Sequence, residues 1–297
     1  MNDSTVTTTP ASTRLLVPLA LLGVYLIWGS TYLAIRIGLG GYPPFLLAAI
    51  RFLVAGGLMF VFLRWRGFAL PTPRQWLNCA VAGTLLLGLG NGLVCYAEQS
   101  VPSGIAAVAV ASMPLFAALF AGLYRQWPSR MEWIGLAVGF VGVIVLNLGG
   151  GLRGSPLGAL ALVSAAASWA FGSVWSRRRD MPHPAMSTAA QMLCGCVALG
   201  IFSLLGGERM HALPSLHASF ALAYLVVAGS ILGFSAYIYL LHNVRPALAT
   251  SYAYINPPVA VLIGVAWGGE SVHPLDLAGM AVILAGVGAI TLAKTKR

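Results

Sequence analysis

The stretch Leu15–Arg36, which reads LLVPLALLGVYLIWGSTYLAIR, decides what kind of protein this chain forms. Its apolar part, Leu15–Ala34, has the length of about 20 helical residues that a hydrocarbon core roughly 30 Å thick requires. The preceding tail, residues 1–14, carries neither a clear basic n-region nor a small-residue cleavage site, so no removable signal peptide is expected. The run is therefore predicted to stay in the protein as a transmembrane helix.

Apolar runs of similar length follow one another along the whole chain. They predict spans near residues 15–36, 43–65, 75–97, 103–124, 131–149, 156–177, 184–205, 218–240, 246–268 and 274–293. Glycine and proline mark the breaks, as in residues 40–44 and 181–184. Connections this short indicate an antiparallel helical bundle, and the alternating pattern of a transmembrane β-barrel is not visible in the sequence.

The composition also points to a membrane protein. Of the 297 residues, 59% are hydrophobic and only 8% are charged, whereas soluble domains carry about 25% charged residues. The net charge of +10 could indicate nucleic-acid binding. Basic residues also collect in the cytoplasmic loops of membrane proteins, however, so the expected partner is the lipid bilayer and no nucleic-acid partner is expected. The four cysteines, Cys79, Cys95, Cys194 and Cys196, lie in apolar runs and indicate neither a disulfide framework nor a metal site.

The distribution of Lys and Arg predicts the orientation. With a cytoplasmic N-terminus, the inner side receives Arg14, Arg64, Arg66, Arg74, Arg125, Arg130, Arg177, Arg178, Arg179, Arg245, Lys294, Lys296 and Arg297. The outer side receives Arg36, Arg153 and Arg209, while Arg51 lies inside the second span. This bias places both termini in the cytoplasm of a bacterial cell, with the protein in the inner membrane.

The chain contains an internal repeat. Trp28 and Arg36 are eight residues apart, and so are Trp169 and Arg177. Pro114 precedes Pro257 by 143 residues, and glycines of the fifth and tenth spans match at an offset of 144. The predicted repeats are residues 15–150 and 151–293, flanked by the tails 1–14 and 294–297. Because each holds five spans, an odd number, the fold class is ten transmembrane helices in two inverted repeats, an arrangement typical of secondary transporters.

Several of these residues form a familiar pattern. Trp28–Tyr32 with Arg36, then Arg51–Phe52, resemble the drug/metabolite transporter superfamily, specifically its EamA-type ten-helix exporters. The proline-containing helices and the glycines that follow each of them, such as Gly142 and Gly279, resemble the same family. The resemblance is strongest to the amino-acid exporters, including the aromatic type, and implies export of amino acids or related metabolites. One departure is that Glu270 of the second half matches Gln126 in the first.

The candidate site residues are polar, aromatic or kink-forming residues within the spans. Substrate-cavity candidates are Trp28, Thr31, Tyr32, Asn91, Tyr96, Trp169, Ser173, Tyr237, Tyr239, Tyr252 and Asn256, and the helix-kink candidates are Pro114, Pro257 and Pro258. An aromatic cavity with hydroxyl groups suits a zwitterion with an apolar side chain. The alternatives are interfacial belts for the aromatic residues and packing kinks for the prolines.

Two ionisable residues are further candidates. Arg51 is expected either to pair with a backbone carbonyl, with Glu98 or with a substrate carboxylate, or to extend toward the outer surface. Glu98 ends the third span and is expected to be wetted rather than buried. The sequence shows no Walker motif, zinc signature or nucleophile constellation, so neither enzyme activity nor a cofactor is expected. The predicted function is alternating-access export by a monomer, and the alternative is a passive channel, a facilitator or a membrane sensor.

Overall fold

The computed structural model describes residues 11–125, 155–243 and 252–294, together with residues 130, 133–135, 137, 138, 141, 142 and 145. All regular secondary structure in these residues is helical. The first half contains α1 (Ala11–Gly38), α2 (Pro44–Trp65), α3 (Pro73–Gly83), the π-helical segment η1 (Thr84–Asn91), α4 (Gly92–Ala97), α5 (Ser103–Val110) and α6 (Met113–Gly122). The second contains α8 (Pro156–Ser176), α9 (Pro184–Leu205), α10 (Leu216–Tyr224), the π-helical segment η2 (Leu225–Leu232), α11 (Gly233–Asn243), α13 (Tyr252–Gly268) and α14 (Pro274–Lys294).

Seven of the described helical segments are long and apolar enough to cross a membrane. They are Leu16–Gly38, Pro44–Trp65, Pro73–Ala97, Ser103–Gly122, Pro156–Ser176, Pro184–Leu205 and Leu216–Leu240, and two shorter apolar helices are Ile255–Gly268 and Leu277–Gly286. Large apolar side chains remain exposed on these spans, such as Val61 at 68% and Leu204 at 80%. Exposed surface of this kind fits contact with lipid, and the chain is a multi-pass membrane protein.

The helix boundaries follow from local chemistry. Proline occupies the first position of α2, α3, α8 and α9, where its missing N–H group has no intrahelical role. Thr72 and Gln75 form a capping box at the start of α3. Seven predicted spans lie within two residues of the observed ends: 15–36, 43–65, 75–97, 103–124, 156–177, 184–205 and 218–240. Most of the predicted span 131–149 and the start of 246–268 lie outside the described residues.

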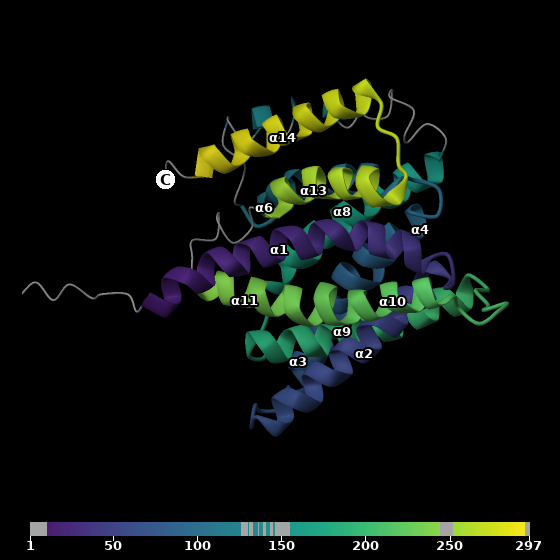
Figure 1. Cartoon of the computed structure of the whole chain (residues 1–297). Coiled ribbons are helices and arrows are strands. Elements are labelled where there is room, and N and C mark those ends of the chain that lie inside the picture. Colours follow the sequence, from purple (N-terminus) through teal and green to yellow (C-terminus); the bar gives the residue numbers. More distant parts are fainter. Residues whose placement is uncertain are drawn as a thin grey trace, which may run out of the picture.

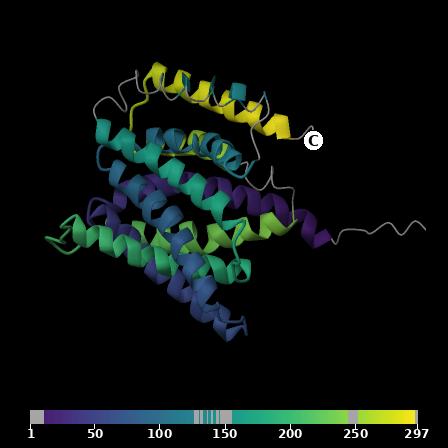
Figure 2. The same cartoon turned by 180° about the vertical axis from the view of Figure 1, so that it is seen from behind.

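Helices of the two halves pack against each other in a reciprocal way (Figures 1 and 2). α1 packs mainly on α13 and α11, while α8 packs mainly on η1 and α6. α2 packs on α9 along its length, and the two run antiparallel. Phe45 at the start of α2 contacts Phe202 late in α9, and Phe68 just after α2 contacts His183 just before α9. The second and seventh spans are thus equivalent in sequence order and opposite in direction.

Glycines allow close approach between some of these helices, as expected for helix packing in lipid. Gly142 lies against the tenth predicted span, because an added Cβ would meet the backbone nitrogen of Ile283 at 2.6 Å and the carbonyl oxygen of Gly279 at 3.0 Å. This contact brings the fifth and tenth predicted spans together at Gly142 and Gly279.

Candidate functional site

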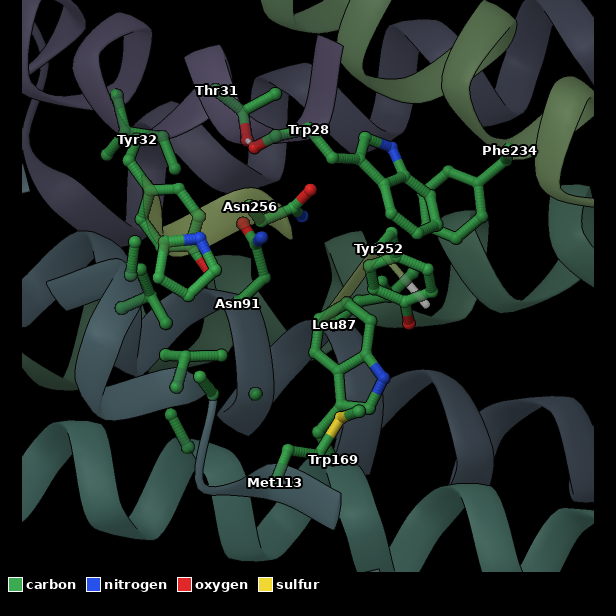
Figure 3. Close-up of a pocket in the computed structure, with 18 of the residues that line it drawn as sticks. Trp28, Thr31, Tyr32, Leu87, Asn91, Met113, Trp169, Phe234, Tyr252 and Asn256 are labelled. Carbon is green, nitrogen blue, oxygen red and sulfur yellow. Dashed lines mark hydrogen bonds between the residues drawn. The ribbon is translucent and has the colours of Figure 1, made fainter. Parts of the chain in front are cut away.

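A cavity of about 100 Å³ lies between the two halves (Figure 3). It is lined by Trp28, Thr31, Tyr32, Ile35, Arg51, Phe52, Leu87, Gly90, Asn91, Val94, Ala107, Val110, Ala111, Met113, Ala165, Trp169, Phe234, Tyr252, Asn256 and Pro257. These residues come from α1, α2, η1, α4, α5 and α6 of the first half and from α8, α11 and α13 of the second. Any movement of one half against the other therefore changes the cavity.

Irregular backbone gathers around this cavity. Asn91 ends the π-helical segment η1, and Ala111 lies in the two-residue break, residues 111–112, between α5 and α6. Pro114 follows that break and has no N–H group to donate to the carbonyl of Val110. Pro257 lines the cavity from inside α13. Non-helical backbone at membrane depth is tolerated where it is buried in protein or lines a cavity, so these features agree with a binding site.

One wall of the cavity is an aromatic cluster built around Trp28. Its ring lies 5.2 Å from that of Phe234 and 4.7 Å from that of Tyr252, both in edge-to-face orientations. The Trp28 Nε1–H group donates to the carbonyl oxygen of Gly229 at 3.0 Å, which anchors the indole to the opposite half. Tyr237 packs behind this wall, 5.4 Å from Trp28 and 5.5 Å from Tyr252.

Trp169 forms another part of the lining, together with Leu87 and Met113 (Figure 3). It packs closely on η1, since an added Cβ at Gly90 would lie 2.9 Å from the six-membered ring of Trp169. The nearby Ser168 donates to the carbonyl oxygen of Leu85 at 2.8 Å. The π-helical geometry of η1 and the glycine at position 90 thus make room for the indole.

The structure places seven of the eleven cavity candidates at this site and four elsewhere. Trp28, Thr31, Tyr32, Asn91, Trp169, Tyr252 and Asn256 line the cavity, and Tyr96, Ser173, Tyr237 and Tyr239 do not. Tyr96 is 37% exposed and stacks on Phe45. The carbonyl oxygens of Ser173 and Tyr239 accept hydrogen bonds from Ser176 and Asn243, within their own helices. Of the three prolines, only Pro257 is a lining residue.

Two polar groups of the cavity are buried without a hydrogen-bond partner among the described residues. Arg51 is 4% exposed, and its Nη1 atom has no partner. Asn256 is 7% exposed, and its Oδ1 atom has none. In Figure 3 the amide groups of Asn91 and Asn256 point into the space between the aromatic side chains. Leaving buried polar groups unpaired costs free energy, so the cavity is suited to a ligand with both a donor and an acceptor.

Polar contacts between the halves lie close to one end of the cavity. The carboxylate of Glu270 is 3% exposed and accepts from Arg36 Nη1 at 2.7 Å. It also accepts from the N–H and Oγ–H groups of Ser103 at 2.9 and 2.6 Å and from the N–H of Gly104 at 3.1 Å. Glu270 of the second half therefore caps the N-terminus of α5 of the first half. This network ties the two halves together at that face.

The expectation that Glu98 is wetted is wrong. Its side chain is 4% exposed, and neither carboxyl oxygen has a partner within the described part of the chain. Glu98 lies one residue beyond the span Pro73–Ala97. Burial, together with the nearby Glu270 carboxylate, raises the pKa of Glu98 well above its usual range, although Arg36 opposes this shift. The packing of neighbouring elements over the span end, which no local pattern reveals, accounts for the error.

Sequence reasoning missed the apolar part of the lining. Phe234, Leu87, Val110 and Met113 resemble the lipid-facing and core residues around them, so their composition carries no signal. The π-helical segments were also missed. A possible signal was the repeat itself, because η1 and η2 are both eight residues long and begin 141 residues apart.

Long apolar helices around a polar and aromatic cavity define a membrane transporter as the class of protein. The chain belongs to the EamA-like transporter family, whose model matches residues 15–148 and again residues 156–292. The resemblance indicated by the sequence is thereby confirmed.

Several relatives align with nearly the whole chain. An inner membrane transporter of Escherichia coli strain K12, YedA, described as uncharacterized, is 49% identical over 95% of this chain and 93% of its own length. A probable terminal-alkyne amino-acid exporter of Streptantibioticus cattleyicolor is 29% identical over 90% and 91%. A probable amino-acid metabolite efflux pump of Salmonella typhimurium is 27% identical over 91% and 92%. A crystal structure shares the fold with a TM-score of 0.68 at 22% identity, covering 97% of this chain and 100% of that chain.

Proposed function

We propose that this protein is an inner-membrane secondary transporter that exports amino acids or related small metabolites by alternating access. The observation that carries the proposal is the cavity between the halves, with its aromatic walls and its unpartnered donor and acceptor. Relatives described as an inner membrane transporter, an amino-acid exporter and an amino-acid metabolite efflux pump support the membrane and the substrate class. The cavity forms within one chain, so the proposed transporting unit is a monomer.

The proposed architecture is ten transmembrane helices in two inverted repeats. The antiparallel packing of α2 on α9 supports the inversion, because both are the second helix of their repeat. The reciprocal contacts of α1 with α13 and of α8 with α6 support a pseudo-twofold relation. Two near-equivalent halves around one site can exchange conformations, which opens the site first to one side and then to the other.

Transport in proteoliposomes tests this function directly. Purified protein would be reconstituted and assayed with a panel of radiolabelled amino acids, including leucine and phenylalanine. Saturable flux with counterflow is expected for a carrier, whereas a passive channel gives neither. Absence of flux for every amino acid would contradict the proposed substrate class, and flux without saturation or counterflow would support the channel alternative.

Replacing Trp169 with Ala is expected to lower transport about tenfold while leaving insertion and folding intact. The indole lines the cavity, and losing an aromatic contact with the substrate costs about 1.4 kcal/mol, which is a tenfold change in binding. The matched control is Trp65→Ala, because Trp65 is 80% exposed at the end of α2. Equal flux in Trp169→Ala and the wild type, at equal expression, would remove Trp169 from the substrate site.

Cysteine labelling tests the proposed orientation. In a variant whose four native cysteines are replaced by alanine, single cysteines would be placed at Arg178 and Arg209. With both termini in the cytoplasm, an impermeant maleimide added to intact cells should label position 209 and spare position 178. Labelling at position 178 alone would reverse the topology.

A further inference from the structure

We infer that Arg51 is the anion anchor of the cavity, so that the transported solute must carry a carboxylate or a similar anionic group. This inference rests on the proposed function and deepens it by naming the substrate group that the site recognises. It depends on the position, the partners and the charge of one side chain.

The Arg51 side chain is held in place by both halves of the molecule. Its Nε–H group donates to Ser230 Oγ in η2 at 2.9 Å. Its guanidinium carbon lies 4.9 Å from the centre of the Phe52 ring, and an added Cβ at Gly229 would lie 3.1 Å from its Nη2 atom. The guanidinium is therefore oriented before any ligand arrives, which lowers the entropic cost of binding.

The donor capacity of Arg51 is not used up by these contacts. Nη1 is buried and has no hydrogen-bond partner in the described part of the chain, and Arg51 lines the cavity. Arg51 forms no ion pair with a carboxylate among the described residues, and the nearby ion pair of the cavity end joins Arg36 to Glu270 instead. A buried charge without a counter-ion is costly, and an anionic ligand in the cavity would remove that cost.

The alternative arrangements of Arg51 that the sequence allows, an ion pair with Glu98 or extension toward the outer surface, fit the structure less well. The Glu98 carboxyl makes no hydrogen bond or ion pair with Arg51. Extension toward the outer surface does not fit a side chain that is 4% exposed and bonded to Ser230. A carboxylate suits the planar guanidinium, because it can accept two parallel N–H···O bonds. Asn256 Oδ1, the unpartnered acceptor in the same cavity, suits an ammonium group. The lining therefore offers a partner for each of the two charged groups of an amino acid.

Three probes of similar shape separate the anion from the rest of the solute. Leucine carries both charges, 4-methylpentanoate lacks the ammonium, and 3-methylbutylamine lacks the carboxylate. Binding to purified wild-type protein would be titrated through tryptophan fluorescence, since Trp28 and Trp169 line the cavity. We expect leucine and 4-methylpentanoate to bind and 3-methylbutylamine to bind at least about tenfold more weakly, because the amine lacks the carboxylate that would accept charge-assisted hydrogen bonds from Arg51.

Substitutions at Arg51 then assign the effect to this residue. Arg51→Gln should weaken binding of both carboxylates about 10- to 100-fold and leave the affinity for the amine unchanged. Arg51→Lys keeps the positive charge but loses the planar guanidinium, so it should weaken binding of both carboxylates by an intermediate factor. This variant also tests the inference if Arg51→Gln fails to fold. The matched control is Arg66→Gln, at the exposed end of the same helix, which should bind all three probes as the wild type does.

The outcomes distinguish this inference from the proposed function. If the amine binds as tightly as leucine, if neither carboxylate binds, or if the Arg51 variants weaken all probes equally, the anion anchor is wrong. Amino-acid flux in proteoliposomes would still support the exporter in each of these cases. Conversely, Arg51-dependent binding of 4-methylpentanoate without flux of any amino acid would support the anchor and contradict amino-acid export.

Discussion

Replacing Glu270 with Gln is expected to lower transport by about tenfold or more. The substitution should open the end of the cavity that lies next to Glu270. The Glu270 carboxylate accepts four hydrogen bonds, from Arg36, twice from Ser103 and from Gly104. Because the Arg36 side chain is 41% exposed, the ion pair itself contributes little, about 0–1 kcal/mol. The larger loss of stability comes at the N-terminus of α5, because the amide of the Glu270→Gln variant would place its own N–H groups against the buried donors of Ser103 and Gly104.

The hydrogen bonds of Glu270 stabilise one conformation of the transporter more than the other. Contacts between Glu270 and α5 join the two halves, so they favour a closed state, in which the halves touch at this end, over an open state, in which they separate there. Losing about 2–3 kcal/mol would change the ratio of closed to open states roughly 30- to 160-fold. Since export requires both states, a strong bias toward one of them lowers turnover.

Accessibility of the cavity measures this bias. A cysteine at Ala107, a lining residue, would be labelled with a thiol reagent added from the side of Glu270. Glu270→Gln should raise the labelling rate at least about tenfold. The matched control is Glu208→Gln, which removes a carboxylate from the N–H groups of Phe45 and Leu46 at the start of α2. Because α2 and α9 pack along their length, this variant should label as the wild type does, and equal labelling in both variants would contradict the prediction.

Replacing Gly83 with Ala is expected to lower the thermal stability of the purified protein by about 5 °C or more. An added Cβ at Gly83 would collide with the carbonyl oxygen of Gln191 and lie 3.1 Å from the nitrogen of Gly195, both in α9. These are backbone atoms, so α3 and α9 would have to separate. Overpacking of this kind costs about 1–3 kcal/mol.

The control for Gly83 is a glycine that has free space around it. An added Cβ at Gly57 in α2 meets nothing within 4 Å, so Gly57→Ala should leave the unfolding temperature unchanged or raise it slightly. Unfolding would be followed by tryptophan fluorescence in detergent. A Gly83→Ala protein with wild-type stability would show that α3 and α9 adjust at no cost, against the packing described above.

Much of the fold could be predicted because lipid imposes a simple rule on each segment. A span must be apolar over about 20 residues and must satisfy its own backbone hydrogen bonds. This rule is local, so runs such as Pro44–Trp65 and Pro184–Leu205 were predicted almost to the residue. The aromatic and amide candidates Trp28, Trp169 and Asn256 were found for a related reason, since polar groups in an apolar span stand out in the sequence.

The site depended on contacts between distant segments. Glu98 lies just beyond the end of its span, where a wetted side chain is expected, yet packing in the folded bundle leaves it only 4% exposed. Tyr96 and Tyr239 carry the same kind of side chain as Tyr32 and Tyr252, but helix rotation keeps them out of the cavity. Rotation is set by packing against neighbouring helices, and a nearly uniform apolar helix does not encode it.

The sequence by itself determined the membrane environment, most span boundaries, the repeat and the transporter family. The first three follow from composition and periodicity within short windows and from likeness between the halves, and the family follows from the resemblance of motifs such as Trp28–Tyr32. Only the tertiary structure decided that Arg51 meets Ser230, that Glu270 caps α5 and that Trp28 meets Tyr252. Such pairs join residues about 170 to 225 positions apart. Their partners become defined only when helices of the two halves pack together, because burial and pairing are properties of the assembled bundle.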